Sequence, residues 1–385
     1  MSSTRYDIAI VGGGLVGASL ALALADGRRR VCLIERQTVT APPADDSWDA
    51  RVYAISPGSR AFLARFDGFH IPGSRRAPVL AMDVRGDRGG RIRFDALEMA
   101  ADELAVIVEN RCLLWSLWRR FDERIERLTG VTPTAVWIEP DAATLELDDG
   151  SSLSARLLVA ADGANSWLRR EAGIEFERLS YHQHGVVANF QCERDHGSVA
   201  RQWFRHDGVL AWLPLPGNRL SMVWSTDDAH AKALLDMPLP MLSSTVADAG
   251  CRVLGGLTAL APAQAFPLAL GRASATIGPR LALVGDAAHT VHPLAGQGVN
   301  LGFGDARELA DLLASHDGDP GDPLLLARYA RGRAEDVRAM QSVCHGLQRL
   351  FGHPSGTAAV LRNLGLRLVD GMGPLKRGLM QQAFR

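Results

Sequence analysis

The sequence lacks the features that mark several large classes of protein. Its five cysteines are widely separated and form no C-x-x-C pair, which excludes the usual zinc motifs and a disulfide framework and suits a reducing compartment. No stretch approaches about 18 consecutive apolar residues, so no transmembrane helix is predicted. The formal net charge is only −1, which leaves no overall basic field for nucleic acid. The histidines between residues 182 and 206 have no metal-ligand spacing, and we predict no metal site.

A signal peptide is also missing, because the N-terminal residues enter a strand pattern directly, and we expect a cytoplasmic protein. The content of 47% apolar and 22% charged residues is that of a globular protein. With 385 residues the chain is long enough for two domains, each with its own core.

The first chemical signal is a glycine-rich turn between two predicted strands. Residues 6–11 form an apolar strand, a helix rich in Ala and Leu follows the turn, and a second strand ends at Glu35. The turn contains G-x-G-x-x-G at Gly12, Gly14 and Gly17. This order is the one that a dinucleotide-binding fold requires, with the acid placed to accept ribose hydroxyls. Because an acid disfavours a 2′-phosphate, the pattern predicts FAD or NAD here, and Arg36 beside it is a further cofactor-binding candidate.

A second glycine-rich stretch occupies residues 285–302, after an apolar strand at 281–284. Asp286 at the strand end can accept hydrogen bonds from sugar-type hydroxyls. The glycines lead into a helix, whose N-terminal N–H groups attract negative charge. We expect Gly298 to need a positive φ or to lie very close to a cofactor ring. The alternative is an ordinary strand–loop–helix connection.

Three further sites are candidates for cofactor contact. Asp162 and Gly163 follow a buried strand at 157–161, and capping of the next helix is an equally acceptable role for Asp162. Arg51 precedes a stretch expected to be helical, where it could pair with a phosphate or simply be solvated. Arg111 lies at a predicted helix start, within reach of a cofactor along the sheet.

The pattern of elements predicts an α/β fold: a Rossmann-like FAD-binding domain, an inserted β-rich substrate domain and a C-terminal helical region. Short strands and turns over 181–227 and a hairpin over 79–95 indicate the inserted domain. The expected boundaries are 1–75, 105–175 and 275–315 for the FAD domain, 76–104 and 176–274 for the β-rich domain, and 316–385 for the helical region.

Three motifs in this order resemble the FAD-dependent aromatic hydroxylases of the p-hydroxybenzoate hydroxylase fold. They are GGGLVG with Glu35, ADGANS at 161–166, and GDAAHTVHPLAGQGVNLG at 285–302. HPLAGQGVNLGFGD and DARVYAISPGSRAFL are similar to the ubiquinone-biosynthesis hydroxylases of the UbiH/UbiF type.

The resemblance implies roles for these residues. The N-terminal glycines would hold the FAD pyrophosphate, Glu35 the adenosine ribose, and Asp286 the ribityl chain. Asp162 and Gly163 match a motif associated with both FAD and the pyridine nucleotide. The residues implied to lie near the flavin or the rest of the cofactor are Arg51, Arg111, Pro293, Gly296, Gln297, Gly298, Val299 and Asn300. No side chain is implied as a catalytic base.

The resemblance also implies the reaction. NAD(P)H, docking transiently, would reduce FAD, and O₂ would form a flavin C4a-hydroperoxide that hydroxylates a polyprenylated phenol or quinol. A flavin hydroxylase of a soluble aromatic compound, a flavin- or NAD-dependent reductase and a non-catalytic nucleotide-binding protein stay open as alternatives. A lipid-like substrate implies peripheral contact with the inner membrane or with a ubiquinone-biosynthesis complex. The segment best suited to that contact is 361–384, for which packing as a helical cap is the competing interpretation.

Overall fold

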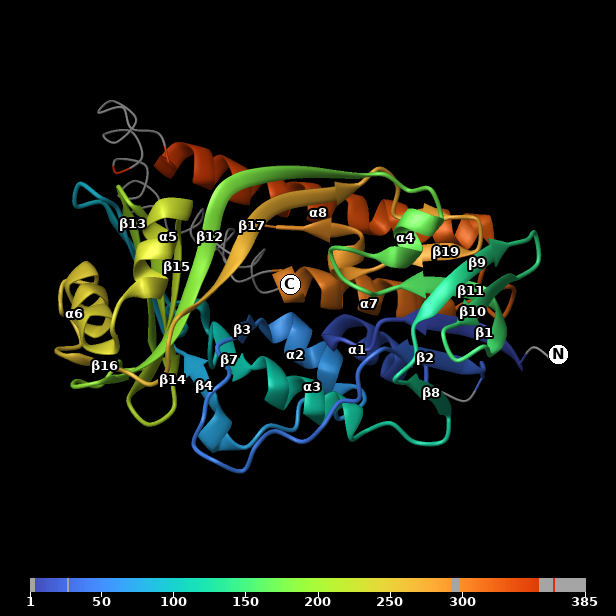
Figure 1. The fold of residues 1–385 in the computed structure, drawn as a ribbon, viewed down its shortest axis with the longest axis horizontal. Coiled ribbons are helices and arrows are strands. Elements are labelled where there is room, and N and C mark those ends of the chain that lie inside the picture. Colours follow the sequence, from blue (N-terminus) through green and yellow to red (C-terminus); the bar gives the residue numbers. More distant parts are fainter. Residues whose placement is uncertain (1–3, 26–27, 292–297, 353–362, 364–385) are drawn as a thin grey trace.

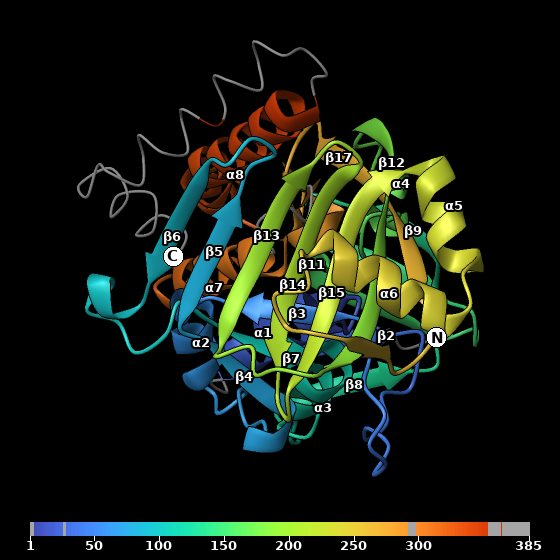
Figure 2. The ribbon, with the colours of Figure 1, turned by 90° about the vertical axis from the view of Figure 1, so that its left-hand side faces the viewer.

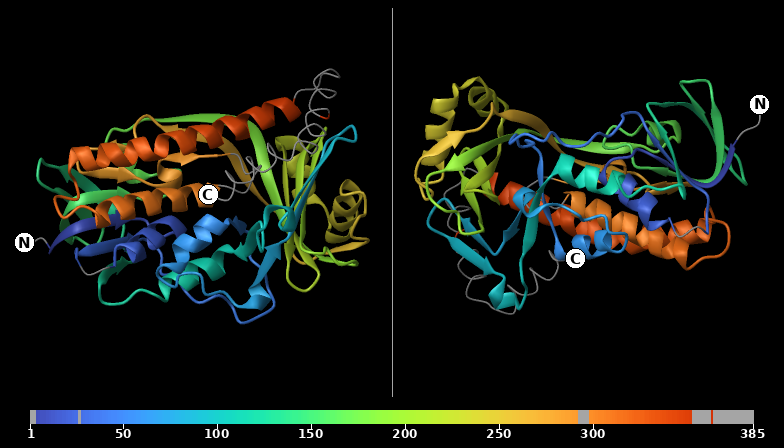
Figure 3. Two further views of the ribbon diagram at one scale, coloured as in Figure 1. Left: turned by 180° about the vertical axis from the view of Figure 1, so that it is seen from behind. Right: turned by 90° about the horizontal axis from the view of Figure 1, so that it is seen from below.

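The computed structural model describes residues 4–25, 28–291, 298–352 and 363. Two large sheets form the body of the molecule, and the long strands β12 (Phe176–Cys192) and β17 (Gln264–Ala273) extend from one region to the other (Figure 1). The C-terminal helices α7 (Gly298–Ala314) and α8 (Pro323–Gly352) lie side by side along the first region (Figure 3).

The first sheet is mainly parallel and has the order β18-β19-β11-β1-β2-β8. Its strands are β18 (Ile277–Gly278), β19 (Leu281–Leu283), β11 (Ser152–Ala160), β1 (Thr4–Val11), β2 (Val31–Glu35) and β8 (Ile125–Thr129). The antiparallel strands β9 (Pro133–Ile138) and β10 (Ala143–Leu147) extend from β11. Strands such as β2 are buried along nearly their whole length, as expected for a sheet covered on both faces.

Helices cover one face of this sheet and a smaller layer covers the other. The larger core joins the sheet to α1 (Leu15–Ala23), α2 (Pro57–Ala64), α3 (Asn110–Trp118), α7 and α8. On the opposite face, β9, β10 and α4 (Trp167–Glu171) enclose a second core. The carboxyl ends of the parallel strands are left facing the second sheet.

The second sheet is the β-rich part predicted from the sequence, with the order β20-β17-β12-β15-β14-β13-β5-β6. Its other strands are β20 (His289–Thr290), β15 (Arg219–Asp227), β14 (Gly208–Leu215), β13 (Val199–Arg205), β5 (Ala81–Arg85), β6 (Arg91–Asp95) and the short β16 (Leu257–Ala259) beside β12. All pairings are antiparallel except β13 with β5. Helices α5 (Asp228–Asp236) and α6 (Leu239–Ala249) cover its outer face (Figure 2).

A third, small sheet links the two large ones. It contains β3 (Val52–Ile55), β7 (Ala105–Glu109) and β4 (Arg76–Val79). The helix expected after Arg51 is α2, which begins at Pro57 after the Ser56 cap, and β3 lies between Arg51 and this helix. Pairing with β7 holds residues 52–55 extended.

The predicted α/β class with a Rossmann-like sheet, a second β-rich sheet and C-terminal helices is confirmed. None of the helices in the described part of the chain is long and apolar enough to cross a membrane. Of the segment 361–384, only Asn363 is described. Its side-chain oxygen accepts from Gly90 N at 2.8 Å, which places this one residue against the β5–β6 hairpin.

Candidate active site

Four parallel strands bring the predicted cofactor residues to one edge of the first sheet. Their pairings run β19–β11–β1–β2, all parallel, so their carboxyl ends share that edge. The residues at or just beyond these ends are Gly12 after β1, Glu35 in β2, Asp162 after β11 and Asp286 after β19. Ligands of open α/β sheets bind at this edge.

The first glycine turn is tight at two positions and open at the third. Gly12 has φ +107°, and a Cβ there would lie 2.4 Å from the carbonyl oxygen of Ala161. A Cβ at Gly17 would lie 1.9 Å from the Gly12 carbonyl oxygen, so α1 can pack this closely only with glycine. Gly14 instead faces open space, and as the N-cap of α1 it offers no side chain to the first N–H groups. An anionic group can therefore complete this helix end.

Glu35 and Trp118 hold the glycine turn from two sides. Glu35 Oε2 accepts from Gly13 N at 2.6 Å and Oε1 from Gln37 N at 2.9 Å. Trp118 Nε1 donates to Gly13 O at 2.8 Å. Nothing in the sequence reveals the direction of the Trp118 indole N–H, so this contact is seen only in the structure. Lone pairs remain on the Glu35 carboxylate for ribose hydroxyls.

Asp162 caps the following helix and also keeps one oxygen unused. Its Oδ2 accepts from Trp167 N at 2.7 Å and Leu168 N at 3.2 Å, so the capping alternative describes its contacts. Its Oδ1 is buried and has no partner among the described residues. Gly163 next to it has φ +84° and faces open space. Such an unpaired buried oxygen is costly and suggests a missing hydrogen-bond donor.

Two buried charged residues fix the loop that carries Asp286. Asp305 Oδ2 accepts from Gly285 N at 2.9 Å and from His289 Nε2 at 2.7 Å. From the other side, Arg169 Nη1 donates to Ala287 O at 2.8 Å. The loop is thus held at residues 285, 287 and 289, while Asp286 between them stays accessible.

Arg333 of α8 completes this buried network, because its Nε donates to Asp305 Oδ1 at 2.7 Å. Burial alone would raise the pKa of Asp305, but the charges and hydrogen bonds of His289 and Arg333 outweigh burial and keep that pKa below its usual range. Sequence reasoning missed Arg169, Asp305 and Arg333. These three residues lie far apart in the chain. Of the network, only His289 and Asp305, 16 residues apart, fall within the recognised glycine-rich motifs.

Asp286 shares its surroundings with residues from other elements. Its side chain reaches solvent, yet desolvation by the surrounding protein raises the pKa of its carboxyl. The charge of Asp305 raises this pKa further, whereas His289 and Arg51 lower it. Burial also raises the pKa of Tyr53, and the charge of Asp286 contributes. Arg51 stacks on Phe266 of β17 at 4.3 Å. The first sheet, β3 and the second sheet therefore meet around Asp286.

Two further arginines predicted to bind the cofactor have different surroundings from Arg51, and their role stays a prediction. Arg111 is bound within the protein: its Nε donates to the buried Glu109 at 3.1 Å and its Nη1 to Ser47 Oγ at 3.1 Å. Arg36 is exposed, and the residues that the structure describes offer its side chain no hydrogen bond or ion pair. Neither of them belongs to the group around Asp286.

The first turn of α7 contains the described part of the second glycine-rich loop, while Pro293, Gly296 and Gln297 lie outside the described residues. Asn300 joins this turn to the small sheet: its Oδ1 accepts from Ser56 N at 3.0 Å, and its Nδ2 donates to Ala54 O at 2.8 Å. Val299 is half-buried beside it. The expectation of a positive φ at Gly298 is wrong, because Gly298 begins the helix; among the residues that the structure describes, a Cβ there would meet Val291 at an ordinary 3.8 Å.

The residues present fit FAD. The glycine turn at α1 offers an open, uncapped helix end, and Gly163 borders open space at the same sheet edge. The carboxylates of Glu35, Asp162 and Asp286 follow along that edge and supply acceptors for hydroxyl groups. Glycines at the start of α1 and before α4, together with the carboxylates at the strand ends, define a flavin-type dinucleotide site on an α/β fold.

Comparisons with known proteins agree with this class. Residues 123–343 match the family described as FAD binding domain, and residues 7–61 match FAD dependent oxidoreductase. The ubiquinone hydroxylase UbiL of Rhodospirillum rubrum is 36% identical over 98% of this chain and 89% of its own length. The 3-demethoxyubiquinol 3-hydroxylase of Escherichia coli is 36% identical over 100% of both chains.

More distant relatives extend the comparison. The human mitochondrial ubiquinone biosynthesis monooxygenase COQ6 is 31% identical over 100% of this chain and 93% of its own length. Among solved structures, p-nitrophenol 4-monooxygenase of Pseudomonas putida superimposes with a TM-score of 0.80 over 100% of this chain and 99% of that one, at 19% identity. The chain belongs to the FAD-dependent aromatic hydroxylases, within the group of ubiquinone-biosynthesis hydroxylases of the UbiH/UbiF type.

Proposed function

We propose that the protein hydroxylates the aromatic ring of a polyprenylated phenol or quinol in ubiquinone biosynthesis, with FAD, NAD(P)H and O₂. The observation that carries this proposal is the single sheet edge on which the open glycine turn, Glu35, Asp162 and Asp286 lie, facing the inner side of the second sheet. Full-length similarity to proteins named as ubiquinone hydroxylases supports the substrate class.

The protein's own residues would hold the cofactor in three places. Gly12, Gly14 and Gly17 would receive the pyrophosphate at the start of α1, because N–H groups there are uncapped. Glu35 would accept the adenosine ribose hydroxyls. Asp286, held in place through its neighbours by Asp305 and Arg169, would accept the ribityl hydroxyls.

At the other end, the first turn of α7 would lie near the ring system. Val299 and Asn300 belong to that turn, and its positive helix end favours negative charge on a bound ring. When bound, FAD supplies electron transfer from NAD(P)H and the activation of O₂ for oxygen transfer. Arg51 and Tyr53, which border Asp286, are placed to contact the cofactor or the substrate.

We also propose the domain division expected from the sequence. Strands of the parallel sheet come from within 1–75, 105–175 and 275–315, and β5, β6 and β12–β17 come from 76–104 and 176–274. This division would let the β-rich part supply the substrate wall while the FAD part keeps a fixed cofactor edge.

A polyprenylated substrate resides in a lipid bilayer, so we propose that the protein works as a peripheral protein on the cytosolic side of the inner membrane. Residues 361–384 combine large apolar side chains with Arg362, Arg367, Lys376 and Arg377 and contain one acid, Asp370. Such a segment favours reversible docking on anionic lipid.

The experiment supplies the FAD-loaded protein with NADH or NADPH, ¹⁸O₂ and two phenols, one with a short prenyl chain and one without. We expect one ¹⁸O atom per hydroxylated product and higher kcat/KM for the prenylated phenol. Consumption of NAD(P)H without ¹⁸O in any product would identify a reductase. Equal kcat/KM for the two phenols would favour a soluble aromatic substrate.

A further inference from the structure

The inner face of the second sheet carries a polar side chain that the fold does not use. Along β13, Trp203 packs outward with residues of α5 and α6, whereas Ala200 and Phe204 belong to clusters on the other side. Side chains alternate along a strand, so Gln202 points inward with Ala200 and Phe204.

Gln202 lies in apolar surroundings. Its neighbours across the ladder are Ala211 on β14 and Val84 on β5. Gln202 is only 6% exposed, and no described residue forms a hydrogen bond with its amide, whose atoms are not among the fully enclosed unpaired ones and so border accessible space. Such an amide keeps little contact with water and gains no protein partner, so it adds little to the stability of the fold.

The position of Gln202 points toward the proposed site. Ala200, two residues away on the same face, packs in one cluster with Ala54 of β3. Ala54 O in turn accepts from Asn300 in the first turn of α7. The inner face around Gln202 therefore adjoins the helix start that carries the second glycine-rich loop.

We infer that Gln202 is a specificity-determining residue, whose amide hydrogen-bonds an oxygen substituent on the ring of the aromatic substrate. This inference rests on the proposed function and adds to it the recognition of a ring oxygen. An amide suits a phenol, a quinol or a methoxy group, because it both donates and accepts. A site built to bond an oxygen discriminates against an analogue without it, since the amide would then stay buried and unpaired.

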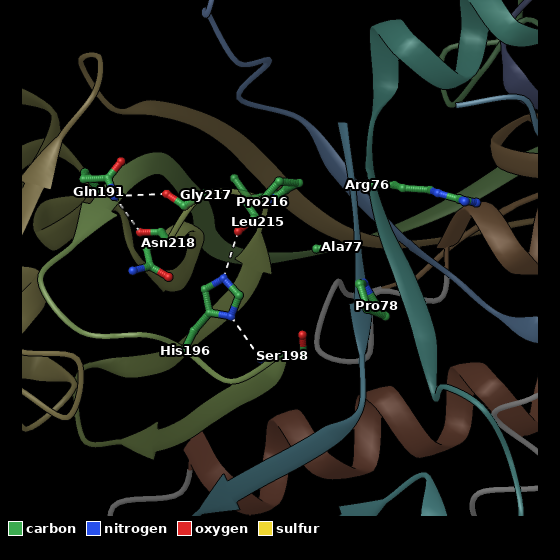
Figure 4. Close-up of a pocket in the computed structure, with 10 residues that line it drawn as sticks. All are labelled: Arg76, Ala77, Pro78, Gln191, His196, Ser198, Leu215, Pro216, Gly217 and Asn218. Carbon is green, nitrogen blue, oxygen red and sulfur yellow. Dashed lines mark hydrogen bonds between the residues drawn. The ribbon is translucent and has the colours of Figure 1, made fainter. Parts of the chain in front are cut away.

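A second glutamine offers a matched control. Gln191 on β12 belongs to a different hollow, of about 420 Å³, which is also lined by Arg76, His196 and Asn218 (Figure 4). Its Nε2 donates to Gly217 O at 3.0 Å and to Asn218 O at 3.1 Å. The Gln191 amide is therefore used for structure, while that of Gln202 is available for a ligand.

The test compares Gln202→Leu with Gln191→Leu in the FAD-loaded protein. Melting temperature is measured first, and then ligand affinity is measured by anaerobic titration of the flavin absorbance. The ligands are 2-methoxyphenol, 2-ethylphenol, which lacks the ether oxygen, and 2-methylanisole, which lacks the hydroxyl.

We expect Gln202→Leu to melt no lower than the parent, because it removes an amide that no described residue bonds, and to bind 2-methoxyphenol about tenfold more weakly. For one of the two single-oxygen ligands, the loss should shrink to less than twofold, which identifies the oxygen that Gln202 contacts. Gln191→Leu should melt lower and bind all three as the parent does.

The inference is overturned if Gln202→Leu weakens all three ligands equally, weakens none, or melts clearly lower than the parent. These outcomes are distinct from failure of the proposed function, in which the unaltered protein itself binds no phenol and gives no ¹⁸O-labelled product.

Discussion

Some residues at the sheet edge stabilise the fold, whereas others have side chains available for a ligand. Asp162 uses one oxygen to cap α4, whereas Asp286 accepts no hydrogen bond from another described residue. Asp286 also stands among protein groups that raise the pKa of its carboxyl. We therefore expect these two carboxylates, which look equivalent in the sequence, to respond differently to the same substitution.

Asp286→Ala should reduce FAD retention more than Asp162→Ala, because the Asp286 carboxylate forms no hydrogen bond with a described residue and is available to the cofactor, whereas Asp162 caps a helix. Asp162→Ala should instead lower the free energy of unfolding by about 1 kcal/mol through loss of a helix cap. FAD released on denaturation and urea unfolding of each purified variant measure the two effects. Equal FAD occupancy in both variants would contradict this ranking.

At the scale of elements, the contact between α1 and α7 sets how closely two parts of the cofactor site approach. A Cβ at Gly302 of α7 would lie 2.6 Å from Val16 Cγ2 of α1. The same atom of Val16 also lies 3.2 Å from a Cβ built at Gly285, where φ is +59°. Val16 therefore packs against both glycines, and the two helix starts keep a fixed separation.

Gly302→Ala should lower the free energy of unfolding by about 1–3 kcal/mol, because the new methyl group overlaps Val16. Adding Val16→Ala should recover part of this loss, whereas Gly298→Ala, where the space is open, should cost little. Thermal or urea unfolding is measured for the parent, the single variants Gly302→Ala, Val16→Ala and Gly298→Ala, and the double variant. Additive losses in the double variant would show that the clash is not with Val16.

The buried network of His289, Asp305 and Arg333 ties the Asp286 loop to both C-terminal helices. The pKa of Asp305 is lower in the folded protein than its usual value of about 4. The stability that its charge contributes is therefore present above about pH 4 and is lost as the pH falls through the lowered pKa.

Asp305→Asn should lower the free energy of unfolding by about 3–5 kcal/mol at neutral pH, since an amide offers one acceptor where the protein presents three donors. The difference between variant and parent should shrink as the pH falls below about 4. Urea unfolding across pH 3–7 provides the comparison. A difference that does not change with pH would show that the charge of Asp305 does not stabilise the fold.

At the scale of the whole molecule, the described part of the C-terminal segment meets the second large sheet. Asn363 contacts the β5–β6 hairpin, where a Cβ at Gly90 would lie 2.6 Å from Asn363 Oδ1. The tail thus touches the β-rich sheet at one described point. Its basic residues at 376 and 377 lie beyond the described part of the chain.

The double change Lys376→Glu with Arg377→Glu tests the proposed membrane contact. Its product should remain folded and FAD-loaded and keep activity on a short-chain phenol. It should lose co-sedimentation with liposomes that contain phosphatidylglycerol, together with turnover of a long-chain substrate, because headgroup attraction is reversed. Unchanged liposome binding and long-chain turnover would place substrate entry elsewhere.

The sequence determined by itself those features that depend on neighbours in the chain. The tight turn at Gly12 and Gly17, the strand end at Asp286 and the two-sheet α/β class follow from local glycine requirements and from alternating or continuous apolar runs. Local pattern did not predict the short strand β3, which is held extended by pairing with β7, about 50 residues further along the chain.

Only the tertiary structure decided which side chains meet. Arg169, Asp305 and Arg333 are separated by long stretches of chain, and Arg111 shares a network with Glu109 and Ser47 that its position in the sequence did not reveal. The unused amide of Gln202 is visible only when its neighbours on β14 and β5 are known. Hydrogen bonds and burial depend on distances in space, and those distances are set by the packing of the sheets and not by sequence spacing.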